Sequence, residues 1–146
     1  MIDQTLVIRK INLILRDLKE LAKFGEMALA SYQSERMNSA AAERYLERII
    51  GRMIDINFHI ITELGHPPPK DYFESFTMLG RHRVLPAEFS EQIASAAGLR
   101  NRIVHEYDVL DDRKVHQAIK TAVKDIPLYL DQVTRFVHSQ GTESAK

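Results

Sequence analysis

The stretch LERIIGRMIDINFHIITELG, residues 46–65, decides the fold class of this chain. Its apolar side chains recur at intervals of three and four residues, which is the spacing of an amphipathic helix. Gly65 closes the stretch and suits the left-handed conformation in which many helices end. The stripe comprises Leu46, Ile50, Met53, Asn57, Ile60 and Leu64, with Ile49, Ile54, Ile56 and Ile61 beside it.

The same helical periodicity appears on both sides of this stretch. Before it, apolar residues over 7–28 repeat at intervals of three and four. After it, three prolines at 67–69 form a rigid connector, because proline lacks the amide donor that continues a helix. A short helix over about 71–80 follows, since Asp71 and Glu74 have the spacing of a helix-capping pair.

Two further helices complete the pattern. Pro86 suits the first position of a helix whose buried stripe continues over 89–104. The last helix opens at Asp111 or Asp112, where an acid favours the positive end of the helix dipole, and continues to Val137. Extended alternation of apolar and polar residues is missing, so strands are not expected. The sequence therefore predicts an all-α protein, an up-and-down helical bundle of four long helices plus one short helix.

Composition limits the classes to which the chain can belong. Its 146 residues suit a single helical domain, which we place at 1–138, followed by a disordered tail at 139–146. Twenty basic and twenty acidic residues balance, so any contact with RNA must be local. The lack of cysteine excludes disulfides and fits a reducing compartment. Neither a signal segment nor a membrane-spanning run occurs, so we expect a cytoplasmic protein without membrane contact.

The polar stretch GLRNRIVHEYD, residues 98–108, lies where the neighbouring helical stripe builds a core. Continuing that stripe by steps of three and four places Arg100 on the apolar face. Because an unpaired buried charge costs several kcal/mol, Arg100 needs an acidic partner, a water-filled cleft or an anionic ligand. On an ideal helix His105 lies about 40° from Asn101 but about 140° from Arg100. Arg100 and His105 therefore meet on one substrate only if the helix end distorts or two subunits contribute, which favours a dimer.

Structural roles remain open for each of these residues. His105 near a helix C-terminus interacts favourably with the dipole, and Asn101 suits a cap or an interhelical hydrogen bond. Tyr107 suits a ring that closes the core while its hydroxyl reaches water. Arg100 also suits a buried ion pair with one of three nearby acids, Asp108, Asp111 and Asp112.

The residues around position 100 resemble the motif of the HEPN superfamily, in which an arginine and a polar residue precede a histidine at short range. A tyrosine two places after the histidine resembles the HepT-like ribonuclease toxin branch. The helical layout and the segment GHPPPKDYFESF share the resemblance, which covers most of the chain. The matching residues are Arg100-Asn101-Arg102-Ile103-Val104-His105-Glu106-Tyr107.

The resemblance implies a HEPN-like fold and metal-independent cleavage of RNA in a cleft at a homodimer interface. His105 would handle the proton of the ribose 2′-OH or of the leaving 5′ oxygen, because histidine changes charge near neutral pH. Arg100 would stabilise the phosphate charge with its planar fork of donors. Asn101 would orient His105 or bond the phosphate, and Arg102 would add a second phosphate contact. No cofactor is implied, and the histidines include no pair at the i, i+4 spacing of a helical metal site.

The resemblance also implies a partner protein. Members of this branch are typically neutralised by a small MntA-type nucleotidyltransferase, which would transfer AMP onto Tyr107. The added charge and bulk would repel and obstruct RNA. We therefore interpret the chain as the endoribonuclease toxin of a type VII-like toxin–antitoxin pair. The alternatives are a non-catalytic HEPN interaction module, which dimerises and docks the nucleotidyltransferase, and a nucleotide-binding helper that uses the same cleft.

Overall fold

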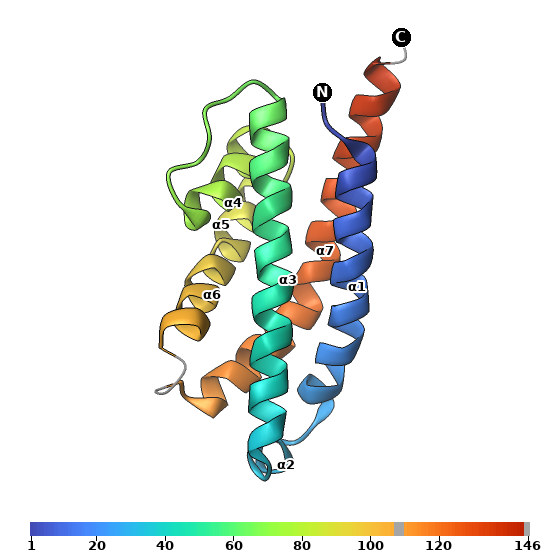
Figure 1. Ribbon diagram of the computed structural model, residues 1–146. Helices are drawn as coiled ribbons and strands as arrows, with labels where there is room; N and C mark the ends of the chain where they lie inside the picture. Colours follow the sequence, from blue (N-terminus) through green and yellow to red (C-terminus); the bar gives the residue numbers. More distant parts are fainter. Residues whose placement is uncertain (107–109, 145–146) are drawn as a thin grey trace.

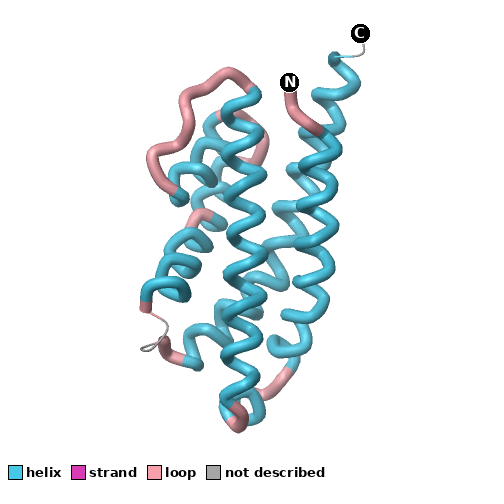
Figure 2. Tube along the Cα trace, viewed as in Figure 1, coloured by secondary structure: helices cyan, strands magenta, loops and turns pink. Residues whose placement is uncertain are grey.

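The computed structural model describes residues 1–106 and 110–144, and the elements within them are helices joined by loops (Figures 1 and 2). The prediction of an all-α fold is confirmed for these residues. The three long helices, which lie side by side, are α1 (Gln4–Glu26), α3 (Arg36–Glu63) and α7 (Asp112–Ser144). The four short helices are α2 (Leu29–Gln33), α4 (Tyr72–Arg81), α5 (Ala87–Ile93) and α6 (Ser95–His105).

α4, α5 and α6 cover one side of the long α3 helix, whereas α2 lies at its first end (Figure 1). α4 and α6 pack directly against α3, and α5 packs against both of them. On the other side α3 contacts α1, which in turn packs along α7. One face of α6 is therefore packed against the bundle, and its other face is exposed to solvent.

Two of the predicted helix ends are confirmed by their local hydrogen bonds. Asp71 caps α4 by accepting a hydrogen bond from the Glu74 amide at 2.7 Å, and the Glu74 carboxylate accepts one from the Lys70 amide at 3.2 Å. Gly65 has a φ of +88° just after α3, the left-handed conformation that glycine adopts without steric cost. These ends set where the connector between α3 and α4 begins and finishes.

The helix predicted from Pro86 onwards is wrong as a single element, because it is divided at Ala94 into α5 and α6. The Ser95 hydroxyl donates to the Gln92 carbonyl at 2.9 Å, which competes with the regular backbone ladder. The Ala97 amide donates to the Ala94 carbonyl, three residues back, at 3.0 Å. This tighter turn gives α6 a direction of its own.

Other boundaries also differ from the prediction. α2 was not expected, and α3 begins at Arg36, well before the apolar stripe. Because the helix predicted from Pro86 is divided, the described residues hold three long helices rather than four. α7 continues to Ser144, so residues 139–144 are helical where a disordered tail was expected. The Gln4 side chain of α1 donates to the Val137 carbonyl at 3.3 Å, which ties the two helices together near this end.

The core is one hydrophobic cluster with a buried polar link through it. The Tyr129 hydroxyl of α7 donates to Asn57 Oδ1 of α3 at 2.5 Å. Asn57 Nδ2 donates to Ser75 Oγ of α4 at 3.2 Å. The link therefore fixes three helices relative to one another. Among the described residues, no helix combines the length and apolarity needed to cross a membrane.

Candidate active site

α6 carries the motif residues, and the structure directs their side chains to different sides. Arg100 is half-buried and faces α3 and α4, whereas Arg102 is exposed and lines a groove between α6 and α7. Asn101 is exposed, as is His105, the last residue of α6. Tyr107 lies outside the described residues. The exposed position of His105 leaves its ring accessible to a ligand.

The guanidinium of Arg100 has one buried nitrogen, Nε, without a hydrogen-bond partner among the described residues. The guanidinium carbon lies 5.2 Å from the centroid of the Tyr72 ring, within range of a cation–π interaction. α3 presents Gly51 to this side chain, and a Cβ there would lie 3.8 Å from Arg100 Nε. Arg100 thus approaches the backbone of α3 while keeping free donors.

The ion-pair alternative for Arg100 is not supported by the described acids. Arg100 takes part in none of the ion pairs among the described residues. Asp111 instead accepts a hydrogen bond from the Arg113 amide at 2.9 Å, at the start of α7. Asp112 lies near Glu43, and Asp108 falls outside the described residues. The charge of Arg100 is therefore not neutralised by Asp111 or Asp112.

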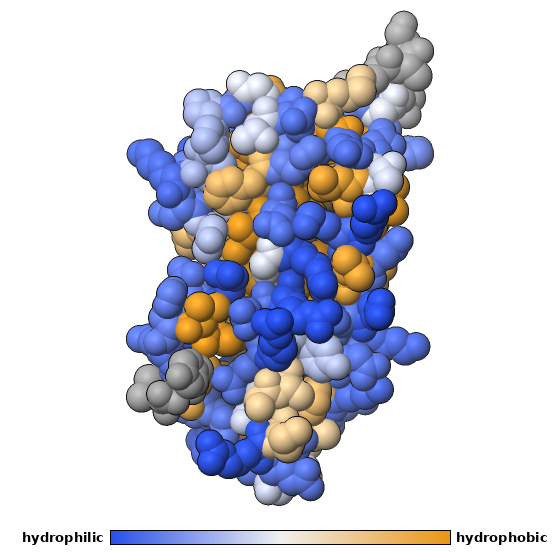
Figure 3. Space-filling view, in the orientation of Figure 1, coloured by the Kyte–Doolittle hydropathy of each residue, from blue (hydrophilic) through white to orange (hydrophobic). Residues whose placement is uncertain are grey.

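Arg100 lines an open pocket of about 560 Å³, which we call the Arg100 pocket. The pocket lies between α3, α4 and α6, and strongly hydrophilic side chains gather over the middle of α3 on this face of the molecule (Figure 3). Tyr72, the first residue of α4, lines this pocket and is 39% exposed. Its other lining residues are Glu47, Arg48, Gly51, Arg52, Ile54, Asp55 and Phe58.

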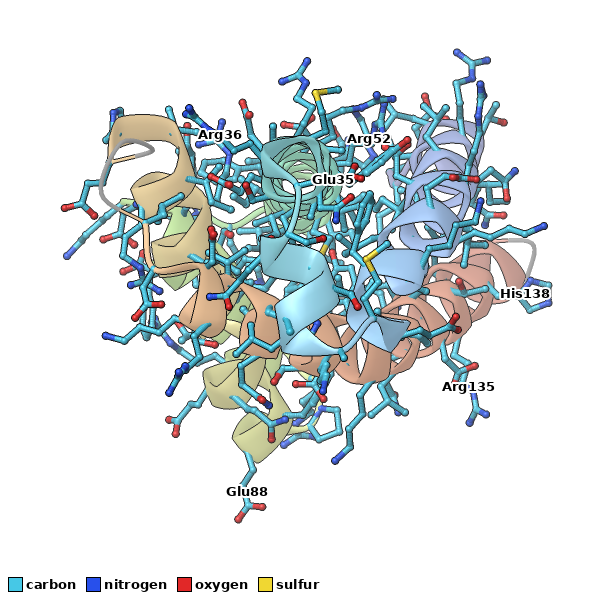
Figure 4. The ribbon with its side chains drawn as sticks, turned by 90° about the horizontal axis from the view of Figure 1, so that it is seen from below. Glu35, Arg36, Arg52, Glu88, Arg135 and His138 are labelled. Carbon is cyan, nitrogen blue, oxygen red and sulfur yellow. The ribbon has the colours of Figure 1, made fainter. Side chains whose placement is uncertain are left out.

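Two arginines of this pocket share one buried carboxylate. Asp17 of α1, whose side chain is 6% exposed, accepts a hydrogen bond from Arg52 Nη1 at 2.6 Å and lies 3.3 Å from Arg48 Nε. Arg52 lies between α3 and α1 in the view along the bundle (Figure 4). The single carboxylate of Asp17 therefore forms ion pairs with both arginines and holds them at the edge of the pocket.

A second groove, of about 650 Å³, lies between the first half of α3 and α6. Its residues include Glu43, whose pKa is raised by burial and, to a smaller extent, by the nearby Asp112 carboxylate. Glu47 lines both this groove and the Arg100 pocket, so the two hollows adjoin along α3. Neither of them includes His105, so a single chain does not bring Arg100 and His105 together in either hollow.

His66, in the loop after α3, and His82, at the end of α4, form a histidine pair. Their rings stack with centroids 3.7 Å apart and an angle of 12° between the planes. Burial lowers the pKa of His82, and the neighbouring His66 and Arg81 lower it further. In the described part of the chain, no three histidine or acidic side chains are grouped as a metal site would need.

The residues that surround Arg100 were not predicted from the sequence. Arg48, Arg52 and Tyr72 lie far from the motif in the chain and reach Arg100 through the packing of α3 and α4 against α6. A signal for two of them was present, because Arg44, Arg48 and Arg52 recur every four residues and so share one face of a helix.

A family model described as ribonuclease HepT-like matches residues 14–133 of the chain. The tRNA nuclease HepT of Aphanizomenon flos-aquae is 38% identical over 136 residues, which cover 93% of this chain and 92% of that protein. The mRNA nuclease HepT of Shewanella oneidensis is 27% identical over 88 residues, which cover 60% of this chain and 66% of that protein. The similarity to the first relative spans nearly the full length of both chains.

Solved structures of similar fold come from toxin–antitoxin complexes. A toxin–antitoxin structure with AMP-PNP gives a TM-score of 0.82 at 22% identity, covering 90% of this chain and 98% of that chain. The tri-AMPylated HEPN toxin of Shewanella oneidensis in complex with MNT antitoxin gives a TM-score of 0.81 at 23% identity, covering 89% and 97%. At these identities the structural similarity establishes the shared helical fold.

Proposed function

Because this chain belongs to the ribonuclease HepT-like family, we propose that it is an endoribonuclease that acts as the toxin of a toxin–antitoxin pair. The observation that carries the proposal is the family match over residues 14–133, which includes the whole Arg100–Tyr107 motif. The ribonuclease class predicted from the motif is confirmed by that membership. The residues that perform the cleavage are part of the proposal.

We propose that cleavage proceeds by attack of the ribose 2′ oxygen on the adjoining phosphorus, without a metal ion. His105 takes the proton of the 2′-OH or supplies one to the leaving 5′ oxygen, and its exposed position allows RNA to reach it. Arg100 stabilises the negative charge that develops on the phosphate oxygens. The bond from phosphorus to the 5′ oxygen breaks, which leaves a 2′,3′-cyclic phosphate and a 5′-OH.

Asn101 and Arg102 are proposed as supporting residues. Both are exposed on α6 near His105, so each is accessible to RNA. Asn101 is proposed to orient His105 or to bond the phosphate, and Arg102 to contact a second phosphate. Their contribution is expected to be smaller than that of Arg100 or His105.

We propose that the active form is a homodimer. Within one chain Arg100 faces α3 and α4, while His105 is exposed at the end of α6 and lines neither hollow around Arg100. A second subunit that meets α6 at this end would bring one histidine close to the arginine of its partner. This arrangement agrees with the angle of about 140° that separates the two positions on an ideal helix.

The partner proposed for this toxin is a nucleotidyltransferase antitoxin that modifies Tyr107. The support is the HEPN toxin of Shewanella oneidensis, which is tri-AMPylated in its complex with MNT antitoxin and shares this fold. Each AMP adds a phosphate charge and an adenosine beside the motif, which would repel and obstruct RNA. Mass spectrometry of the chain after incubation with such an enzyme and ATP tests whether Tyr107 is the acceptor.

Cleavage of single-stranded RNA by the purified full chain in EDTA tests the main proposal. We expect RNA cleavage with cyclic phosphate ends, and a loss of at least about 100-fold for His105→Ala, the usual contribution of a general acid or base. Arg100→Ala is expected to lose activity to a similar degree, whereas Arg135→Ala on the far side of α7 is the matched control (Figure 4). Circular dichroism and light scattering check that each variant is folded and keeps its oligomeric state.

Retention of activity by both His105→Ala and Arg100→Ala would refute the assignment of these residues. Failure of the wild-type chain to cut RNA, together with tight binding to a nucleotidyltransferase, would favour the non-catalytic interaction module instead.

A further inference from the structure

We propose that the Arg100 pocket is a subsite for one nucleotide of a single-stranded RNA, in which Tyr72 stacks on a base and Arg48 and Arg52 hold phosphates. The inference rests on the proposed function, since the subsite would hold part of the strand that Arg100 and His105 cleave. It assigns a substrate-binding role to α3 and α4, which lie outside the motif.

The charges around the pocket support an anionic ligand. The lining residues carry three positive and two negative charges, and with their ion-pair partners included the count is five to three, in a chain whose basic and acidic residues balance overall. An RNA backbone brings one negative charge per phosphate, so the two phosphates that flank one nucleotide would neutralise this excess. The positive residues are Lys10, Arg44, Arg48, Arg52 and Arg100, and the negative ones are Asp17, Glu47 and Asp55.

The arginines are also held in place before any ligand arrives. Asp17 contacts one nitrogen of each guanidinium, Nε of Arg48 and Nη1 of Arg52, while both residues line the pocket. A guanidinium has five N–H donors, so each retains donors for a phosphate. Holding a long side chain in advance reduces the entropy that binding removes. Arg100 lines the same pocket and adds a third guanidinium.

Tyr72 supplies an aromatic surface beside these donors. The Phe58 ring meets it edge-on, with centroids 6.3 Å apart and an interplanar angle of 78°, and Arg100 lies over the ring. These contacts fix the ring, while Tyr72 as a whole is 39% exposed and lines the pocket. Stacking on an exposed aromatic ring is how single-stranded nucleic acids are commonly bound.

The combination of arginines and an exposed aromatic ring favours RNA over an acidic peptide as the ligand of this pocket. A peptide carboxylate would satisfy the arginines but would make no specific use of an exposed ring beside three guanidiniums. A nucleotide carries both a flat base and a phosphate, separated by one sugar, and therefore matches both features. Neighbouring Phe73 is 52% exposed but does not line the pocket, which makes it a matched control for Tyr72.

The test uses the full chain with His105→Ala, so that RNA binds without being cut. A short single-stranded RNA carries 2-aminopurine, whose fluorescence is quenched when it stacks on another ring. Tyr72→Leu is expected to weaken binding roughly 5- to 150-fold, the range measured for loss of a stacking ring, and to remove the quenching. Tyr72→Phe is expected to stay within about twofold of the parent, because the ring is retained. Phe73→Leu is expected to leave affinity and quenching unchanged.

Salt dependence of the affinity tests the arginines. Arg48→Gln is expected to reduce the slope of log affinity against log salt by about 0.7, the value for one phosphate contact to a single strand. Arg135 lies on the exposed surface of α7, outside the pocket, so Arg135→Gln is expected to leave the slope unchanged. An unchanged slope for Arg48→Gln would overturn its assignment as a phosphate contact.

Failure of this inference differs from failure of the proposed function. If Tyr72→Leu binds RNA and quenches 2-aminopurine as Phe73→Leu does, the subsite is refuted, while cleavage by the wild-type chain still supports the ribonuclease. If the wild-type chain does not cut RNA but the Tyr72-dependent quenching is present, the subsite is supported and the nuclease is refuted.

Discussion

Replacing Asp17 with asparagine removes the charge that α1 presents to α3 while keeping the shape of the side chain. Asp17 is buried and serves both Arg52, at 2.6 Å, and Arg48, at 3.3 Å. A hydrogen bond to a charged group contributes about 1.5–3 kcal/mol to stability. The arginine side chains are 21% and 40% exposed, so solvent screens part of each interaction, and asparagine still accepts one hydrogen bond. We therefore expect the free energy of unfolding to fall by about 2 kcal/mol.

Urea denaturation followed by far-UV circular dichroism measures this loss, with an unchanged m-value showing that the unfolding transition is otherwise the same. For a chain of this size, about 2 kcal/mol corresponds to a decrease in Tm of roughly 5–8 °C. The matched control is Asp131→Asn, because Asp131 pairs with Arg135 at 3.2 Å on the exposed surface of α7. An exposed pair contributes less than about 1 kcal/mol. Equal losses for Asp17→Asn and Asp131→Asn would refute the argument from burial.

Three further predictions concern the scaffold. Tyr129→Phe leaves the buried Asn57 Oδ1 without its donor and is expected to lower the free energy of unfolding by about 1–3 kcal/mol in urea; a change below about 0.5 kcal/mol would contradict the role of this bond. Gly65→Ala meets no atom within 4 Å, so the expected loss of about 1 kcal/mol, measured by thermal unfolding, comes from the left-handed φ of +88° alone, and a neutral result would count against it. The pKa of His82 is lowered by burial and by His66, so the unfolded chain binds the proton at a higher pH than the folded chain does. The contribution of His82 to the free energy of unfolding is therefore complete above pH about 6.5 and decreases as the pH drops toward the pKa of folded His82. Urea titrations at several pH values are expected to show a smaller acid-induced loss for His82→Gln, and an equal loss would exclude His82 as the cause.

Most of the helical scaffold was predictable because its signals are local. The stripe over 46–64 and the cap formed by Asp71 and Glu74 depend on residues three or four positions apart, which the sequence displays directly. The division between α5 and α6 depends on the hydrogen bond that the Ser95 hydroxyl donates to the Gln92 carbonyl, a bond that many serines within helices do not make. Along the helical continuation to Ser144, Gln140 and Gly141 line a pocket together with Gln4 of α1, a tertiary contact that no local pattern displays.

The candidate site was predictable only in its α6 part. Spacing alone placed Arg100 on the apolar face, and the structure confirms that it is half-buried there. Its neighbours Arg48 and Tyr72 come from segments separated from it by loops whose path no local pattern determines. Which acid would neutralise Arg100 was open for the same reason, since Asp111 lies close in sequence yet binds its own helix start instead.

We expect Arg100 to lower the free energy of unfolding of the protein when no RNA is bound. Its Nε is buried without a described acceptor, and two further guanidiniums line the same pocket. An unsatisfied buried polar group costs roughly 1–3 kcal/mol, whereas the cation–π contact with Tyr72 returns only about 0.5–1 kcal/mol. Arg100→Met, which fills similar space without charge, is therefore expected to raise the free energy of unfolding of the unliganded chain by about 0.5–2 kcal/mol while abolishing RNA cleavage. Single-stranded RNA should raise the Tm of the His105→Ala chain but have a much smaller effect once Arg100→Met is added. A loss of stability in Arg100→Met as large as that in Asp17→Asn would mean that Arg100 holds the fold together and is not reserved for an anion.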